Sequence, residues 1–430
     1  MAGARALTLD LLLRAEAAGQ YGDRALGAAL ERSALSPADK SFVTALFYGV
    51  TERRVTLDAI IDDRAKLAPS AIETRVRTIL RMGLYQLLYM DRVPDHAAID
   101  EAVTLTPRRS KGFVNALLRG FCRDGKVIPV PPADAPAARR FSVAYAVPVP
   151  LAERFIGIFG EVRAARILEA FTHHPPHTVR VNTLRESRDG FLSSVPGSVP
   201  TPHAPHGVML PPDAPLLDLV RQGRCFVQDE ASQIAVAALG AGPCERVLDL
   251  CAAPGSKSFG AALDMGDRGE VRSFDLHENK ISLIRDGASR LGLSCIRADA
   301  ADARAADPSK LGMFDRVLCD VPCSGLGVLW KKPDVRFKDL DAAAGLLPVQ
   351  AAILDAGAAC VRPGGRLVYS TCTLLPEENE EQVRRFLAAH PDFAPVPFAV
   401  GDLATDGLLT LAPDTHGTDG FFVAVLGKGE

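Results

Sequence analysis

Five short apolar stretches in the second half of the chain have the composition of buried strands, and each ends at or next to an aspartate or a cysteine. Apolar, β-branched strands of this kind are typical of parallel sheets with both faces covered by helices. In open α/β sheets, ligands bind beyond the carboxyl ends of the strands. We therefore expect a doubly wound, Rossmann-like α/β domain with its functional groups along one edge. The stretches are 246–250, 271–275, 295–299, 316–320 and 367–372.

The last two stretches bring two cysteines towards the same edge. The stretch 367–372 ends in Cys372 and precedes a Pro-Glu-Glu helix start, while 316–320 is followed by Val-Pro-Cys323. We expect both thiols to face one crevice. The alternative for each is a small buried core residue, the usual fate of a free cysteine. Zinc binding by Cys319 with Cys323 is not expected, because no second ligand pair stands at zinc-site spacing.

A turn of small residues follows the first of the five strands. Small residues let backbone amides approach a ligand, with the N-terminus of the next helix behind them. The turn matches neither the dinucleotide motif nor the phosphate loop, so a nicotinamide or nucleoside-triphosphate cofactor is not expected. It consists of Cys251, Ala252, Ala253, Pro254, Gly255, Ser256 and Lys257.

Four successive strands end in acids, namely Asp249, Asp275, Asp299 and Asp320. Any one of them could serve as a helix N-cap or a turn former. In register, they would surround one crevice with hydrogen-bond acceptors, with Asp275 placed to bind a ribose diol. S-adenosylmethionine offers hydroxyls, an amino group and a positive charge, and is the expected cofactor. No metal is expected, because the histidines of 173–177 have no cysteine or carboxylate nearby at ligand spacing.

The first part of the chain, from about residue 6 to residue 122, has the apolar spacing of helices and predicts an all-α bundle. Proline-rich segments then indicate a linker and, later, a loop at 196–215. The expected helix signals are Ser36 with Pro37, a capping box at Ser70–Glu73, Asp95 as the cap of 96–105, and a last helix at 112–121. The expected division is a helical domain at 1–126, a linker at 127–140, a small α+β connector at 141–240 and a catalytic domain at 241–430.

Composition indicates the number of domains, the cellular compartment and the kinds of partner to expect. At 430 residues and 47% hydrophobic content the chain can fill two or three cores. Nine scattered cysteines argue for reduced thiols, and without a signal peptide or a membrane-length apolar run we expect a cytoplasmic protein with no membrane partner. The net charge of −3 hides two basic clusters, which are either solvated faces or an RNA path. The clusters are Arg108, Arg109, Lys111, Arg119, Arg123 and Lys126, and Lys331, Lys332, Arg336 and Lys338.

The helical part resembles the NusB-like RNA-binding domain. The fragments that carry this resemblance include Tyr48-Gly49-Val50, Leu84 to Leu88 and Phe113 to Arg119, in that order. The resemblance implies contact with RNA by this domain. The alternative is a helical scaffold that only docks on the next domain.

The second half resembles the Fmu/Sun family of RNA cytosine-C5 methyltransferases. The matching motifs are Cys251 to Lys257, Asp320 to Gly325, and Ser370-Thr-Cys372 with the following Pro-Glu-Glu-Asn379. With the NusB-like part ahead, the chain looks like the branch that acts on small-subunit ribosomal RNA. The departures are Ser256, where a second glycine is usual, and Val321, often alanine; we expect donor binding to survive both.

The resemblance implies a reaction and roles. The protein would transfer a methyl group from S-adenosylmethionine to C5 of a cytosine in 16S ribosomal RNA, cytosine 967 in the family. Cys372 would be the nucleophile and Cys323 would assist product release. Asp275 would bind the ribose, Asp299 would lie near the adenine, and Asp320 near the base or the donor. The thiols have an independent reason, because cytosine C5 becomes nucleophilic only after a thiolate adds to C6; spacing alone leaves open which thiol attacks.

Other functions stay open. An RNA-binding assembly factor with an inactive methyltransferase fold would keep the bundle and tolerate loss of a thiol. Methylation of transfer RNA by the same chemistry is also open. The expected partner is 16S ribosomal RNA or a small-subunit assembly intermediate, and we expect a monomer. The other cysteines of this half, namely Cys244, Cys295, Cys319 and Cys360, are expected in the core.

Overall fold

The computed structural model describes residues 2–18, 23–65 and 68–430, which form two compact units. Unit 1 takes in the chain as far as Thr172 together with Lys332–Phe337, and unit 2 contains His173–Lys331 and Lys338–Glu430. The division after Thr172 falls inside the stretch expected as a connector. Its helical part packs in unit 1, where Thr56 donates a hydrogen bond to the carbonyl of Val143. The four-part division remains a prediction.

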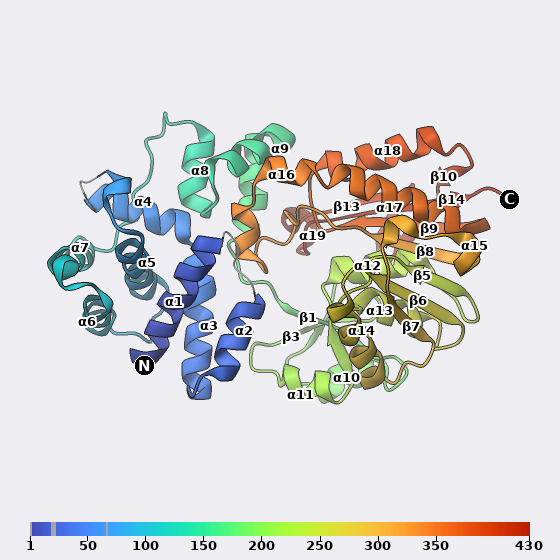
Figure 1. Ribbon diagram of the computed structural model, residues 1–430, viewed down its shortest axis with the longest axis horizontal. Helices are drawn as coiled ribbons and strands as arrows, with labels where there is room; N and C mark the ends of the chain where they lie inside the picture. Colours follow the sequence, from blue (N-terminus) through green and yellow to red (C-terminus); the bar gives the residue numbers. More distant parts are fainter. Residues whose placement is uncertain (1, 19–22, 66–67) are drawn as a thin grey trace. The chain divides into compact units, whose positions relative to one another are not determined.

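Unit 1 is helical, as the apolar spacing predicts (Figure 1). Its main buried core is formed by apolar side chains of the helices between residues 2 and 123, with Leu46, Ile60, Leu80 and Leu118 fully buried. The helices are α1 (Ala2–Ala18), α2 (Asp23–Arg32), α3 (Pro37–Glu52), α4 (Arg54–Ala65), α5 (Thr74–Tyr89), α6 (Asp95–Leu105), α7 (Lys111–Arg123), α8 (Ala137–Tyr145) and α9 (Val149–Ala170), with the 3-10 turns η1 (Pro69–Ala71), η2 (Arg108–Ser110) and η4 (Pro333–Phe337).

The predicted helix starts of unit 1 have different outcomes. Ser36 is confirmed as the N-cap of α3, since its side chain accepts a hydrogen bond from the amide of Asp39. The capping box at Ser70–Glu73 is wrong, because a 3-10 turn occupies 69–71 and the Glu73 carboxylate pairs with Arg109 at 2.6 Å instead. The cap at Asp95 is wrong by one residue, because Asp95 is already helical and Pro94 is the cap.

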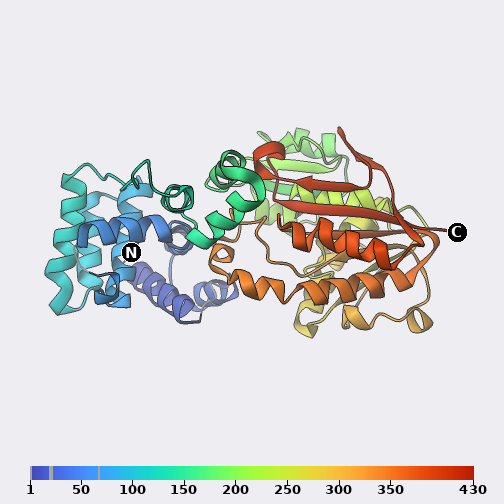
Figure 2. The same cartoon turned by 90° about the horizontal axis from the view of Figure 1, so that it is seen from above.

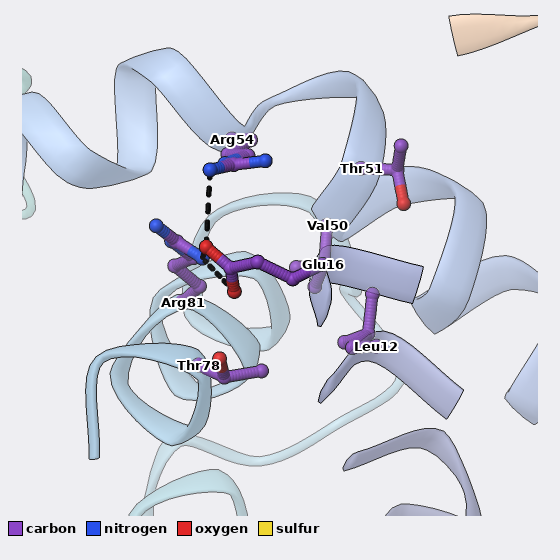
Figure 3. A pocket seen from close by; sticks show the side chains of 7 residues that line it. All are labelled: Leu12, Glu16, Val50, Thr51, Arg54, Thr78 and Arg81. Carbon is purple, nitrogen blue, oxygen red and sulfur yellow. Dashed lines mark hydrogen bonds and ion pairs between the residues drawn. The ribbon is translucent and has the colours of Figure 1, made fainter. Parts of the chain in front are cut away.

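A small pocket in unit 1 shows how this unit neutralises its buried arginines (Figure 3). The Glu16 carboxylate accepts hydrogen bonds from Arg54 at 3.0 Å and from Arg81 at 3.2 Å. Arg81 also binds both oxygens of Asp58, each at 2.8 Å. These paired arginines are therefore engaged in the fold of unit 1.

Unit 2 begins with a four-stranded antiparallel sheet in the order β2-β3-β1-β4. Two of its strands lie inside 196–215, so the expectation of a loop there is wrong. Short edge strands can contain proline, and the β2 strand consists of Val199 and Pro200. The elements are β1 (His177–Val181), α10 (Arg188–Ser194), β2 (Val199–Pro200), β3 (Gly207–Leu210), α11 (Leu216–Arg221) and β4 (Cys225–Val227).

The large sheet of unit 2 has the order β10-β14-β9-β8-β5-β6-β7, with β13 beside β14. The five strands from β9 to β7 are parallel, and β14 is antiparallel to β9. Side chains alternate between the two faces, with Val247 packed on one side and Leu248 on the other. Helices α12 and α17 cover opposite faces (Figures 1 and 2), which confirms the doubly wound α/β domain.

The remaining elements of unit 2 follow in chain order. They are α12 (Glu230–Leu239), β5 (Arg246–Asp249), α13 (Ser256–Asp264), β6 (Glu270–Asp275), α14 (Glu278–Leu291), β7 (Ile296–Ala300), η3 (Ala303–Ala305), α15 (Pro308–Leu311), β8 (Phe314–Asp320), α16 (Leu340–Ala344), α17 (Leu347–Cys360), β9 (Val361–Thr371), η5 (Pro376–Glu378), α18 (Glu380–Ala389), β10 (Phe393–Pro395), β11 (Phe398–Val400), β12 (Leu403–Thr405), β13 (Leu408–Leu411), α19 (Pro413–His416) and β14 (Phe421–Lys428).

Three cysteines expected in the core are confirmed there, namely Cys295, Cys319 and Cys360. The prediction that Cys244 lies in the core is wrong, because this residue is exposed in the turn ahead of β5 and has a left-handed backbone. Among the described residues, no single helix has the length and apolar character of a membrane span, although α8 and α9 together pass that test with a bend of 116°. Within the same residues, no group of three or more His, Cys, Asp or Glu side chains is arranged to hold a metal.

Candidate active site

The structure brings Cys323 and Cys372 together at the carboxyl edge of the large sheet. Strands β8 and β9 are parallel and level, with Asp320 opposite Ser370, so the loops that follow them start side by side. The two sulfur atoms lie 3.3 Å apart, within hydrogen-bonding distance for thiols. This contact raises the pKa of Cys323 well above its usual value, and burial and the charges of Cys372 and Glu378 add to the rise. The contact therefore disfavours a negative charge on both sulfur atoms at once.

A partly buried ion pair lies at the same edge. Lys257 Nζ donates to Asp320 Oδ2 at 2.6 Å, and Ser370 Oγ donates to Asp320 Oδ1 at 2.7 Å. Burial opposes the charge of Lys257, but the carboxylate of Asp320, with Asp249 and Cys372, raises the Lys257 pKa above its usual value. The site thus combines a fixed cation, a carboxylate with both oxygens oriented, and two thiols.

The small-residue turn joins β5 to α13, where the sequence places it. Gly255 has φ of +111°, and a Cβ on it would lie 2.3 Å from the Phe259 ring, so glycine is required there. Asp249 stabilises the turn, because its Oδ2 accepts a hydrogen bond from Ser258 Oγ at 2.7 Å. Burial raises the pKa of Asp249 to about 7. Asp249 is only 1% exposed, so it supports the turn instead of lining the crevice.

The other two strand-end acids differ from each other. Asp275 ends β6 and its carboxylate accepts from the amide of His277 at 3.1 Å and pairs with Lys280 at 3.3 Å. Asp299 lies inside β7, opposite Phe274 in register, and its carboxylate pairs with Arg272 at 3.1 Å. Asp299 and Asp275 therefore point to opposite faces of the sheet. The structure brings Asp275 and Asp320 to the edge and gives Asp299 other partners.

Several residues of the edge were not predicted from the sequence. Glu378 and Gln350 lie behind the thiols, fully buried, and hydrogen-bond to each other at 2.8 Å. Glu378 belongs to the Pro-Glu-Glu-Asn motif and could have been suspected from it. Gln350 could not, because a single glutamine in an apolar helix gives no signal of a site.

A second cluster missed in the sequence involves Asp229, Trp330, Lys331 and Asp419. The Lys331 amine hydrogen-bonds to both carboxylates, 2.9 Å from Asp419, and the Trp330 indole donates to Asp419. Burial raises the pKa of Asp419 to about 7. The interpretation of Lys331 as part of an exposed RNA path is therefore wrong, because its charge is neutralised within unit 2.

Two further members of the second basic cluster have backbone partners. Arg336 is 3% exposed and donates to the carbonyls of Glu52 and Ala146 inside unit 1. Lys338 donates to the carbonyl of Ser324 at 2.9 Å. The first cluster keeps its exposure on η2 and α7, with Arg108, Arg109, Lys111, Arg119 and Arg123 at or near the surface. Of the second cluster, Lys332 and Lys338 are still exposed, so the first cluster is the larger of the two basic surfaces.

Comparison with known proteins agrees with this geometry. The family profile described as "16S rRNA methyltransferase RsmB/F" matches residues 236–427, and the profile of the "NusB family" matches residues 2–123. The first of these spans the large sheet and both thiol loops, and the second spans most of the helices of unit 1.

Full-length relatives extend the match over the whole chain. A Bacillus subtilis protein named probable ribosomal RNA small subunit methyltransferase B is 35% identical over 99% of this chain and 98% of its own. A Synechocystis protein of the same name is 36% identical over 100% of both chains. The solved structure of PH0851 is 26% identical, covers 99% of this chain and 98% of its own, and superposes with a TM-score of 0.79.

Proposed function

Because the chain belongs to the RsmB/F family of S-adenosylmethionine-dependent 16S ribosomal RNA methyltransferases, we propose that it methylates C5 of a cytosine in that RNA. In this proposal the reaction proceeds through a covalent bond between Cys372 and C6 of the base. The observation that carries it is the pair of thiols 3.3 Å apart beside the Lys257–Asp320 ion pair. The family's cytosine 967 is the proposed target.

The residues around the small-residue turn fit S-adenosylmethionine. Gly255 is the N-cap residue of α13, so the turn leads directly into a helix N-terminus, and Asp275 offers its carboxylate at the end of the adjacent strand. Leu276 next to it is 60% exposed, an unusual position for leucine that suits a flat aromatic ring. We propose that the turn from Cys251 to Lys257, with Asp275 and Asp320, holds the donor. When bound, it supplies an electrophilic methyl group. Asp299, expected near the adenine, has its carboxylate paired with Arg272, so its place in the proposed donor site depends on release of that ion pair.

The two thiols have separate tasks in the proposed reaction. The Cys372 thiolate adds to C6, forming a carbon–sulfur bond and making C5 nucleophilic. After C5 has gained its methyl group, it loses its proton, the carbon–sulfur bond breaks and Cys372 leaves as thiolate. In this proposal Cys323 gives its proton to the ring as Cys372 adds, and the Cys323 thiolate so formed accepts the C5 proton at release, after which the ring proton passes to solvent. The raised pKa of Cys323 makes this thiolate a stronger base for the release step.

In this proposal Lys257 stabilises the charge of the Cys372 thiolate, and Asp320 positions the cytosine. The Lys257 cation lies close enough to influence Cys372 and favours its thiolate form. Asp320 has its two oxygens oriented by Lys257 and Ser370, and can still accept a hydrogen bond from the exocyclic amino group of cytosine. A cytosine must leave its stack for C6 to be attacked, so an unpaired loop or junction base is the proposed substrate.

The remaining expectations are also proposals. We propose 16S ribosomal RNA, or an assembly intermediate of the small subunit, as partner, with unit 1 contacting RNA through its exposed basic cluster. A cytoplasmic monomer that uses neither metal nor membrane remains the expected form of the protein.

Denaturing gels test the mechanism directly. Wild type, Cys372→Ala and Cys323→Ala are incubated with unmodified 16S ribosomal RNA and labelled donor, and the covalent adduct and the methylated base are measured. We expect Cys323→Ala to accumulate adduct and Cys372→Ala to form none. The opposite pattern would exchange the two roles. If wild type methylates no RNA, the result favours an assembly factor without methyltransferase activity. If wild type methylates transfer RNA but not 16S ribosomal RNA, transfer RNA is the substrate.

A further inference from the structure

The loop that carries Cys323 is held on both sides by one buried pair of side chains. The amide nitrogen of Gln350 donates to the carbonyl of Pro322 at 3.0 Å and to Glu378 Oε2 at 2.8 Å. The same Glu378 oxygen accepts the backbone N–H of Ser324 at 2.9 Å. The residues immediately before and after Cys323 are thus both bound to the Gln350–Glu378 pair.

The pair is also bound to the strand and loop that carry Cys372. Tyr369 in β9 donates its hydroxyl to the carbonyl of Glu378 at 2.6 Å. Thr373 follows Cys372 directly, and its hydroxyl hydrogen-bonds to that of Ser324 at 2.7 Å. Glu378 therefore connects the two loops whose thiols are in contact.

Glu378 adds a negative charge to this position. It is 1% exposed, and its second oxygen, Oε1, has no hydrogen-bond partner among the described residues. A buried carboxylate so close to Cys323 disfavours a second negative charge there, and it contributes to the raised pKa of Cys323. Two other groups near the thiol pair are Tyr369 and Asp320. The Lys257 cation interacts with both Cys372 and Asp320. The Lys338 amine is bound to the Ser324 carbonyl.

We propose that Glu378, held by Gln350, is the positioning residue that fixes Cys323 against Cys372 and directs thiolate formation to Cys372. The two thiols then have different roles because the buried carboxylate of Glu378 lies on the Cys323 side of the pair. This inference rests on the proposed function for its consequence in catalysis, but the ionisation of the thiols can be measured without RNA.

Two substitutions separate position from charge. Glu378→Gln keeps an oxygen that can accept from Ser324 and Gln350 and removes the charge, whereas Glu378→Ala removes both. Glu381→Gln and Glu381→Ala are matched controls, because Glu381 lies on the neighbouring helix α18 with its side chain 40% exposed. Thermal unfolding and donor binding establish that each variant is folded, and the near-isosteric Glu378→Gln carries the test if Glu378→Ala does not fold.

The first measurement is the alkylation rate of each thiol with iodoacetamide, followed by peptide mass spectrometry between pH 6 and pH 9. In wild type we expect Cys372 to react faster than Cys323. Loss of the neighbouring charge should lower the pKa of Cys323 and reduce this preference several-fold in Glu378→Gln. The second measurement is adduct accumulation with RNA, which should rise in Glu378→Ala because release slows, while the KM for the donor stays unchanged.

The outcomes distinguish this inference from the proposed function. If both Glu378 variants match wild type and the Glu381 controls within twofold in alkylation preference and in adduct level, the inference is overturned. If wild type forms no adduct and methylates no RNA, the proposed function fails, and the alkylation preference alone decides the role of Glu378.

Discussion

Lys257 is the cation that the structure places in the partly buried ion pair with Asp320. Lys257→Met keeps much of the side-chain volume and leaves the charge of Asp320 without its cation. Since loss of one fixed electrostatic contact in an active site typically costs 10²–10³ in rate, we expect a single-turnover methylation rate roughly 10²-fold below wild type. Lys310→Met, at an exposed position, is the control. A rate within fivefold of wild type would contradict the role of Lys257.

Asp249 predicts a pH effect on stability. Burial raises its pKa from 3.8 to about 7, so the folded protein binds this proton more tightly than the unfolded chain. The stabilisation is complete below about pH 4 and is lost as pH rises through about 7. Asp249→Asn cannot ionise and should therefore gain in melting temperature relative to wild type as pH increases from 4 to 8. A difference between the two proteins that is constant over this range would show that Asp249 is ionised in the fold.

At the scale of elements, the loop after Cys323 depends on its contact with the turn before β14. Gly327 donates its N–H to the carbonyl of Cys372 at 3.0 Å, and Gly420 donates to the carbonyl of Gly327 at 2.7 Å. A Cβ on Gly327 would lie 1.8 Å from the Gly420 oxygen. We expect Gly327→Ala to destabilise unit 2 by about 1–3 kcal/mol and to impair methylation. Gly242→Ala, where a Cβ has ordinary contacts, should change neither thermal unfolding nor activity.

At the scale of the whole molecule, the exposed basic cluster of α7 and the catalytic edge should contribute separable functions. Replacing Arg109, Lys111, Arg119 and Arg123 by serine should weaken RNA binding. The slope of log affinity against log salt should become shallower by about 0.7–0.9 for each phosphate that these side chains no longer neutralise. Donor affinity should not change. Serine at Arg221, Arg297 and Lys310, exposed cations of unit 2, is the control. An unchanged salt slope would favour a scaffold role for the helical domain.

Much of the fold was predictable because it depends on local patterns. Alternating buried strands and helices specified the doubly wound sheet, and Ser36 with Pro37 specified a helix start. Where the local pattern was ambiguous, prediction failed. Ser70 matched a capping box, but Pro69 begins a 3-10 turn that displaces the helix start. The strands within 196–215 were missed because the prolines of this segment are typical of a loop. They form part of a sheet only because β3 pairs with β1 and β2 pairs with β3.

The sequence by itself determined which chemical groups the edge of the sheet would carry: two thiols, Lys257, and the acids at the strand ends. Residue type and strand order are enough for this, since parallel strands end at one edge. Tertiary structure alone decided how these groups are used. It buried Asp249, turned Asp299 to the other face, neutralised Lys331, and placed Gln350 and Glu378 behind Cys323. These outcomes depend on strand register and on contacts between distant segments, which no local pattern records.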